Sequence, residues 1–215
     1  VPSFEKAINS LLIKGNVDIY ITGSNAFLLS GELATLLSGR TVEIHVTPLS
    51  FSEAFGASAD MKAFKSYMGG SSFPYARQLD SAADVHTYLE GVYNTVILKD
   101  IAARRGIVDV NQLQRVARFL MSNIGNLTSI KKISDTMTSD GQRISTHAVD
   151  SYISSLSEAY LFYPIRRFDV KGRQLLKTGE KYYVADLGLR NLVLGERDAD
   201  FGHMLENIVC LELIR

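Results

Sequence analysis

The chain has 215 residues, of which 46% are apolar and 21% charged. This composition allows one large folded domain or two small ones and argues against disorder. No run of eighteen apolar residues occurs, so we expect no membrane-spanning helix. The single cysteine, Cys210, excludes an internal disulfide and fits a reducing cytoplasm.

The formal net charge of zero hides an uneven distribution along the chain. Residues 1–110 contain nine Lys and Arg against eleven Asp and Glu, a net of −2. Residues 111–181 contain eleven against six, a net of +5, and residues 182–215 contain three against six, a net of −3. Two interpretations stay open: a polyanion partner for the basic middle, or ordinary charge fluctuation.

The first 57 residues alternate between helical and strand-like patterns. Apolar residues recur at helical spacing over residues 3–14. Residues 17–22 and 41–46 are short, apolar and rich in β-branched side chains, which predicts two buried strands. With a helix over residues 26–38 between them, the strands are expected to be parallel neighbours. An unpaired apolar edge of such a sheet would favour self-association.

The next segment reads as helical, with helices predicted near residues 79–90 and 92–105. From residue 111 onward the pattern predicts three helices followed by two strands, which is the element order of a winged-helix domain. These elements are expected near residues 113–120, 129–137, 145–159, 161–169 and 181–185. A further amphipathic helix is predicted from residue 201 to the last residue.

Polar residues follow the first predicted strand, where open parallel sheets bind their ligands. Ser24 and Asn25 lie in this turn, and Arg40 precedes the second predicted strand. A polar side chain there can orient water or contact a terminal phosphate, and an arginine can neutralise the charge that develops on it. The alternative is that Ser24 and Asn25 only form a turn and that Arg40 is a surface charge.

The predicted helix-turn-helix offers candidate DNA contacts, because a recognition helix presents its N-terminal side chains to base edges while basic side chains meet phosphates. The alternative is a winged helix used for protein contacts or as a rigid spacer. The candidate residues are Lys131, Lys132, Arg143, Ser145, Thr146 and His147, with Lys171 and Arg173 in the predicted wing.

Other chemistry finds no support in the sequence. The four histidines and Cys210 have no zinc-ligand spacing, so no metal site is expected. The G-x-S-x-G string that would indicate a serine hydrolase does not occur in the sequence. No G-x-x-x-x-G-K-S/T string occurs either, so the backbone amides and lysine that hold nucleotide phosphates are missing.

Five stretches of the sequence, in this order, resemble a prokaryotic family of AAA-type P-loop ATPases that carry a C-terminal winged-helix domain and a PD-(D/E)xK nuclease-like domain. The stretches are residues 19–55 (IYITGSNAFLLSGELATLLSGRTVEIHVTPLSFSEAF), 69–76 (GGSSFPYA), 92–107 (VYNTVILKDIAARRGI), 181–189 and 202–207. The family's usual Gly-Gly-Phe-Pro is interrupted here by two serines, which leaves the role of that loop open.

The resemblance implies an α/β plus mostly α chain: the C-terminal part of a P-loop ATPase core with a helical lid, followed by a winged-helix domain. The implied segments are a partial core over residues 1–57, a lid over 58–110, a winged helix over 111–190 and the start of a nuclease-like domain over 191–215. The implied function is coupling of ATP binding and hydrolysis to the winged-helix and nuclease-like effector. A non-enzymatic winged-helix module that binds DNA or protein is the alternative.

The resemblance also implies roles for individual residues. Asn25, with Ser24, would contact the γ-phosphate and orient the attacking water, and Arg40 would act as an arginine finger. Glu206 would belong to a nuclease-like metal site that is incomplete in this chain. ATP and Mg²⁺ are expected in an intact parent protein, with no cofactor for this chain, because the P-loop and the magnesium-positioning Asp-Glu pair would precede Val1.

Overall fold

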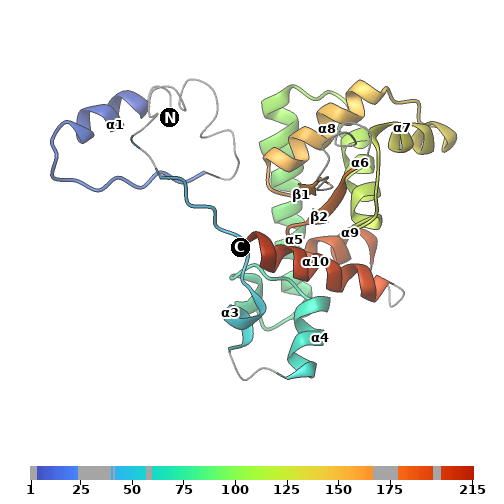
Figure 1. Cartoon of the computed structure of the whole chain (residues 1–215), viewed down its shortest axis with the longest axis horizontal. Coiled ribbons are helices and arrows are strands. Elements are labelled where there is room, and N and C mark those ends of the chain that lie inside the picture. The colour runs from blue at the N-terminus through green and yellow to red at the C-terminus, as the bar shows by residue number, and fades with distance from the viewer. Residues whose placement is uncertain (1–3, 24–39, 41, 57–59, 167–178, 196–199) are drawn as a thin grey trace, which may run out of the picture. The chain divides into compact units, whose positions relative to one another are not determined.

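The computed structural model describes the chain except for residues 1–3, 24–39, 41, 57–59, 167–178 and 196–199. The chain divides into two compact units, residues 1–46 and residues 47–215. Figure 1 gives the labels of the helices and strands.

The first unit contains helix α1 (Phe4–Leu12), as the helical spacing predicts. The two predicted strands are wrong: the described parts of these segments, residues 17–22 and 42–46, have no regular secondary structure. Val42, Ile44 and Val46 are 89%, 74% and 83% exposed. A strand needs hydrogen-bonding neighbours and a covering layer, and the described residues of this unit supply neither. The predicted helix over 26–38 lies outside the described residues.

In its described residues the second unit is mainly helical, with one antiparallel pair of strands. Its elements are α3 (Phe51–Phe55), α4 (Met61–Gly69), the 3₁₀ turn η2 (Ala76–Gln78), α5 (Ala82–Asn94), the π-helical η3 (Thr95–Ala103), α6 (Val110–Ser122), α7 (Ile130–Ser139), α8 (Thr146–Glu158), β1 (Phe162–Ile165), β2 (Lys181–Val184), α9 (Leu187–Leu194) and α10 (Phe201–Ile214).

Most of these helices begin where a short polar side chain caps the free backbone amides, which is a local signal in the sequence. Ser145 accepts a hydrogen bond from the Ala148 amide at the start of α8, where the third helix is predicted to begin. Ser81, Ser129 and Asp109 cap α5, α7 and α6 in the same way. The two helices predicted near residues 79–90 and 92–105 are not separated by a break. Thr95 is itself helical, and α5 runs directly into η3.

The two strands pair antiparallel, with Phe162 opposite Val184 and Ile165 opposite Lys181. Thr128, between α6 and α7, extends this pair through an isolated bridge to Glu180. The Thr128 amide donates to the Glu180 carbonyl at 2.9 Å, and the Thr128 carbonyl accepts from the Glu180 amide at 3.0 Å. The order three helices, then two paired strands, therefore agrees with the pattern expected for residues 111–185.

The core of the second unit lies where α5, η3, α6, α8, α9 and the strand pair meet (Figure 1). Helix α10 lies along β2, and the buried Asn207 side chain bonds both the amide and the carbonyl of Val184 at 2.9 Å. This side chain satisfies the backbone groups of β2 that a further strand would otherwise pair. In the part of the chain that the structure describes, no helix is long and apolar enough to cross a bilayer.

Candidate functional site

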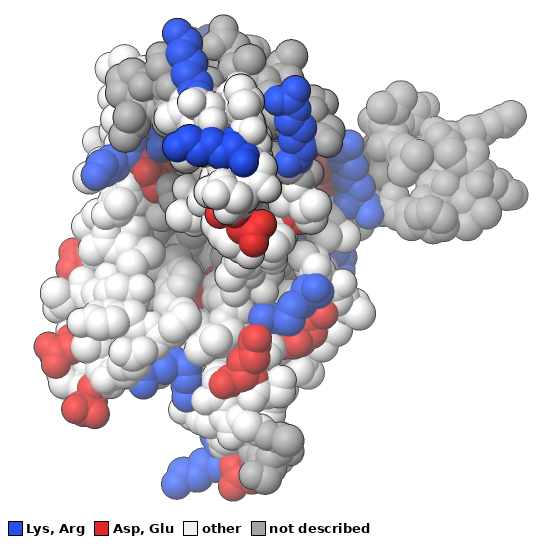
Figure 2. Space-filling view, turned by 90° about the vertical axis from the view of Figure 1, so that its left-hand side faces the viewer, with Lys and Arg blue, Asp and Glu red and all other residues white. Residues whose placement is uncertain are grey.

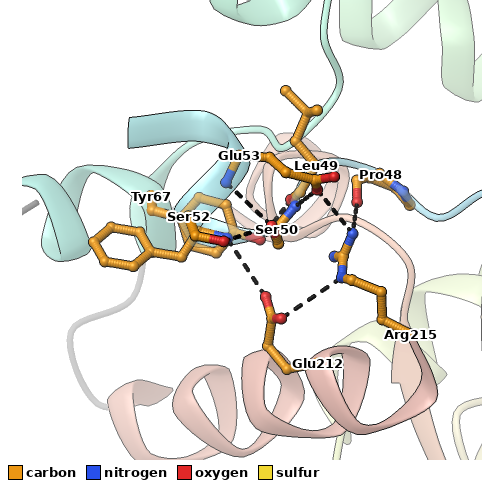
Figure 3. A network of polar contacts seen from close by, with 9 residues as sticks. Pro48, Leu49, Ser50, Ser52, Glu53, Tyr67, Glu212 and Arg215 are labelled. Carbon is orange, nitrogen blue, oxygen red and sulfur yellow. Dashed lines mark hydrogen bonds and ion pairs between the residues drawn. The ribbon is translucent and has the colours of Figure 1, made fainter. Parts of the chain in front are cut away.

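A network of polar contacts ties the segment before α3 to the end of α10 (Figure 3). Arg215 donates from Nη1 to the Pro48 carbonyl at 2.9 Å and to Glu53 Oε2 at 3.1 Å. Glu212 accepts from the Phe51 amide at 3.4 Å and lies 3.6 Å from Arg215 Nε. The last turn of α10 thereby holds the chain where it enters α3.

Local contacts orient the acceptors in this network before α10 reaches them. Ser50 and Glu53 form a capping box, in which the Glu53 amide donates to Ser50 Oγ and the Ser50 amide to Glu53 Oε2. The hydrogen bond from the Ser50 amide, more than the nearby Arg215, holds the pKa of Glu53 below its usual range. Tyr67 donates its hydroxyl to the Leu49 carbonyl at 2.7 Å, and burial raises the pKa of Tyr67 to about 12.

A second polar cluster surrounds Asp186, which is 0% exposed and caps α9. Its Oδ2 accepts three hydrogen bonds, from the Ser72 amide at 2.6 Å, Ser72 Oγ at 2.8 Å and Ser71 Oγ at 3.0 Å. Its Oδ1 accepts from the Leu189 amide at 2.8 Å. Burial raises the pKa of Asp186, while the hydrogen bonds from Ser72, Leu189 and Ser71 act against this shift. The two serines that interrupt the Gly-Gly-Phe-Pro pattern thus bind this buried carboxyl group.

Gly188 lets this loop approach α9 closely. A Cβ atom on Gly188 would lie 2.6 Å from Ser71 Cβ, 2.8 Å from Ser71 Cα and 2.9 Å from Asp186 Oδ1. We expect Gly188→Ala to reduce the free energy of unfolding by about 1–3 kcal/mol, because backbone and a buried carboxyl group would have to move. Urea denaturation followed by circular dichroism measures this. Gly202→Ala in α10 is the control, since nothing lies within 4 Å of its Cβ position; an equal loss in both variants would contradict the packing role.

The Glu206 carboxylate accepts hydrogen bonds from two side chains of β2. Its Oε1 accepts from Tyr183 Oη at 2.6 Å and from Lys181 Nζ at 2.7 Å. Burial alone would raise the pKa of Glu206, but these two hydrogen bonds outweigh it and hold the pKa below its usual value. Among the described residues, no group of three or more His, Cys, Asp or Glu side chains is arranged to hold a metal ion.

The candidate DNA-contact residues that the structure describes lie at the surface around α7 and α8. Lys131, Lys132, Arg143, Ser145, Thr146 and His147 are exposed, and Ser145 uses its hydroxyl to cap α8. Lys171 and Arg173 lie outside the described residues. Exposed acids at positions 135, 140 and 150 balance the three basic side chains here. On the face seen in Figure 2, Lys and Arg gather mainly in the upper part of the view, Asp and Glu lie mainly below them, and large areas carry neither.

The candidate nucleotide-contact residues belong to the first unit. Arg40 is exposed and lies in a bend. Ser24 and Asn25 lie outside the described residues, so the expected grouping of Asn25 with Arg40 stays a prediction.

Sequence reasoning missed the residues that hold these clusters together. Asp186 and Ser71 are 115 positions apart, and Arg215 and Pro48 are 167 apart. Both partners of the Asp186 cluster lie in stretches that carry the family resemblance, and this was the available signal. No pattern along the chain pairs the two stretches.

Comparison with known proteins gives two family matches. Residues 53–200 match a family described as a domain of unknown function (DUF8612), and residues 1–55 match one described as an AAA domain. The two matches overlap within α3. Neither names a winged-helix or nuclease-like domain, so those parts of the resemblance stay predictions.

Two curated proteins align with this chain over its whole length. An uncharacterized protein of Haemophilus influenzae is 42% identical over 222 residues, which is 100% of this chain and 55% of that protein. An uncharacterized protein of Methanocaldococcus jannaschii is 27% identical over 229 residues, which is 100% of this chain and 51% of that protein. The chain therefore spans about half the length of these curated relatives.

No solved structure matches the chain. The DUF8612 match covers more than half of the 215 residues, and the AAA-domain match supports a relationship of the first 55 residues to AAA-type ATPases. The chain belongs to the DUF8612 family.

Proposed function

We propose that this chain is the sensor-bearing part of an AAA-type ATPase that couples nucleotide hydrolysis to a winged-helix effector module. The observation that carries the proposal is the AAA-domain match over residues 1–55, which runs into α3 and so into the second unit. In the proposed arrangement Asn25 orients water at the γ-phosphate and Arg40 neutralises the charge that develops there.

The network around Arg215 supports a mechanical link in this proposal. Pro48 and Glu53 lie in the AAA-matched stretch, and both accept hydrogen bonds from Arg215 at the end of α10. A displacement of the segment that enters α3 would therefore pull on α10, which in turn is bonded to β2 through Asn207. Rigid helices joined by such contacts can carry a shift from one site to another.

Nucleotide binding tests the proposal in the chain and in the full-length protein. The chain has no P-loop lysine or phosphate-cradling loop, so we expect its dissociation constant for Mg-ATP to be weaker than about 1 mM. The full-length protein is expected to bind Mg-ATP in the micromolar range and to hydrolyse it. Isothermal titration calorimetry measures both constants. Micromolar binding by the chain, or no hydrolysis by the full-length protein, would contradict the proposal.

The effector module is proposed to be a winged helix, with α6, α7 and α8 as its three helices and β1 and β2 flanking its wing. The helix order, the antiparallel strand pair and the Thr128 bridge to Glu180 support this. The alternative function, a module that binds DNA without enzymatic activity, draws support from the exposed Lys131, Lys132 and Arg143. Duplex DNA binding that is lost when these three residues become glutamine, in a full-length protein without ATPase activity, would favour the alternative.

A further inference from the structure

A solvent-open hollow of about 710 Å³ lies beside α6. Four of its lining residues, Asn111, Gln114, Arg115 and Arg118, come from one face of α6, because positions three and four apart share a helix face. Tyr93 from α5, Gln142 from the turn before α8 and Val193 from α9 lie across from them. The volume is in the range of small-ligand sites, about 300–1,000 Å³.

The hollow is lined by hydrogen-bond donors, and its two arginines differ in how they are held. Arg118 donates from Nη1 to the Val193 carbonyl at 2.6 Å, which fixes its position and leaves its other N–H groups available. Among the described residues, the Arg115 guanidinium has no hydrogen-bond or ion-pair partner, although the Arg115 backbone belongs to α6. Two positive charges side by side on one helix face repel each other, and an anion between them would relieve this.

The rest of the lining is mostly polar and sets one negative charge against the two arginines. Asp109 is the one carboxylate among the lining residues, and its Oδ1 is used to cap α6 through the Gln112 amide at 2.9 Å. The Tyr93 hydroxyl is protonated at neutral pH and can donate, and burial raises its pKa to about 12. The three amide side chains can each donate and accept, which suits hydroxyl groups on a ligand.

We propose that this hollow is a binding site for a small phosphorylated polyol, such as a sugar phosphate. The phosphate group accepts hydrogen bonds from the guanidinium groups of Arg115 and Arg118, which are suited to bind it with two parallel bonds. The amide groups of Asn111, Gln114 and Gln142 bind the hydroxyls. The site is independent of the proposed ATP hydrolysis, because none of its residues lies in the AAA-matched stretch.

Nuclear magnetic resonance titration of the ¹⁵N-labelled chain tests the proposal, with ribose 5-phosphate, inorganic phosphate, ribose and a single-stranded DNA oligonucleotide as probes. We expect ribose 5-phosphate to bind with a dissociation constant of about 1 mM or tighter and to shift the amides of α6. Ribose is expected not to bind. Arg115→Gln should weaken ribose 5-phosphate about tenfold or more, since it removes a charge-assisted hydrogen bond.

Arg104→Gln is the matched control, because Arg104 is also exposed and does not line the hollow. We expect less than about a twofold change for this variant, with unfolding midpoints unchanged in both. Equal weakening by both substitutions, binding of ribose as tight as that of ribose 5-phosphate, or no binding would overturn the proposal. Arg115-dependent binding of the oligonucleotide without binding of ribose 5-phosphate would also overturn it, and would assign the hollow to nucleic-acid phosphates.

Discussion

Replacing Arg40 by alanine in the full-length protein is expected to lower ATP turnover by about 10³–10⁵-fold, the range for loss of an arginine finger. The affinity for Mg-ATP should change little, because a finger contacts charge that develops mainly in the transition state. Arg40 is exposed and lies in a bend, so the substitution should leave folding intact. Steady-state hydrolysis and nucleotide titration together measure the two effects.

Lys14→Ala is the matched control for this experiment, since Lys14 is another exposed cation of the first unit. It should retain wild-type turnover. If Arg40 acts across subunits, mixing Arg40→Ala protein with a variant that lacks the P-loop lysine should restore part of the activity. Wild-type turnover in Arg40→Ala would return Arg40 to a surface charge.

The Arg190→Ala variant is expected to lose about 3 kcal/mol of folding stability, because it removes a buried arginine from an ion pair with the partly exposed Asp200. Arg190 is 1% exposed and joins three helices. Its Nε donates to the Met121 carbonyl at the end of α6 at 3.0 Å, and its Nη2 pairs with Asp200 at the start of α10. Alanine would leave the Asp200 carboxylate without its partner and open a void in the core.

The Arg190→Met variant distinguishes the stability lost with the positive charge from the stability lost with the side-chain volume. Methionine fills most of the space and leaves no buried cation, so we expect a smaller loss than with alanine, of about 1–3 kcal/mol, from the unpaired Met121 carbonyl and Asp200. Urea denaturation measures the free energy of unfolding of both variants. The difference from the wild type is a change in stability when the m-value is unchanged. Arg104→Ala, at an exposed position, should stay within about 0.5 kcal/mol of the wild type. A loss below about 1 kcal/mol in Arg190→Ala would mean that the ion pair does not hold the helices together.

The sequence by itself determined the local structure of the second unit. Capping side chains such as Ser145 and Asp109 mark where helices begin, and the spacing of apolar residues marks which face is buried. These signals act within a few residues of each other, so they can be read along the chain. They also placed the strand pair near residues 161–169 and 181–185, where β1 and β2 are found, and they put the described basic candidates of α7 and α8 on the surface.

Only the tertiary structure decided which distant residues meet. The sequence gives no reason for Ser71 and Ser72 to bind Asp186, for Arg190 to be buried, or for Arg215 to contact Pro48. Such contacts depend on how helices pack, and packing is set by shape and burial over the whole core rather than by local spacing. The same reason explains why the strands predicted at residues 17–22 and 41–46 are absent from the described parts of these segments. A strand is stable only with neighbours that pair its backbone, and no neighbours are present among the described residues of the first unit.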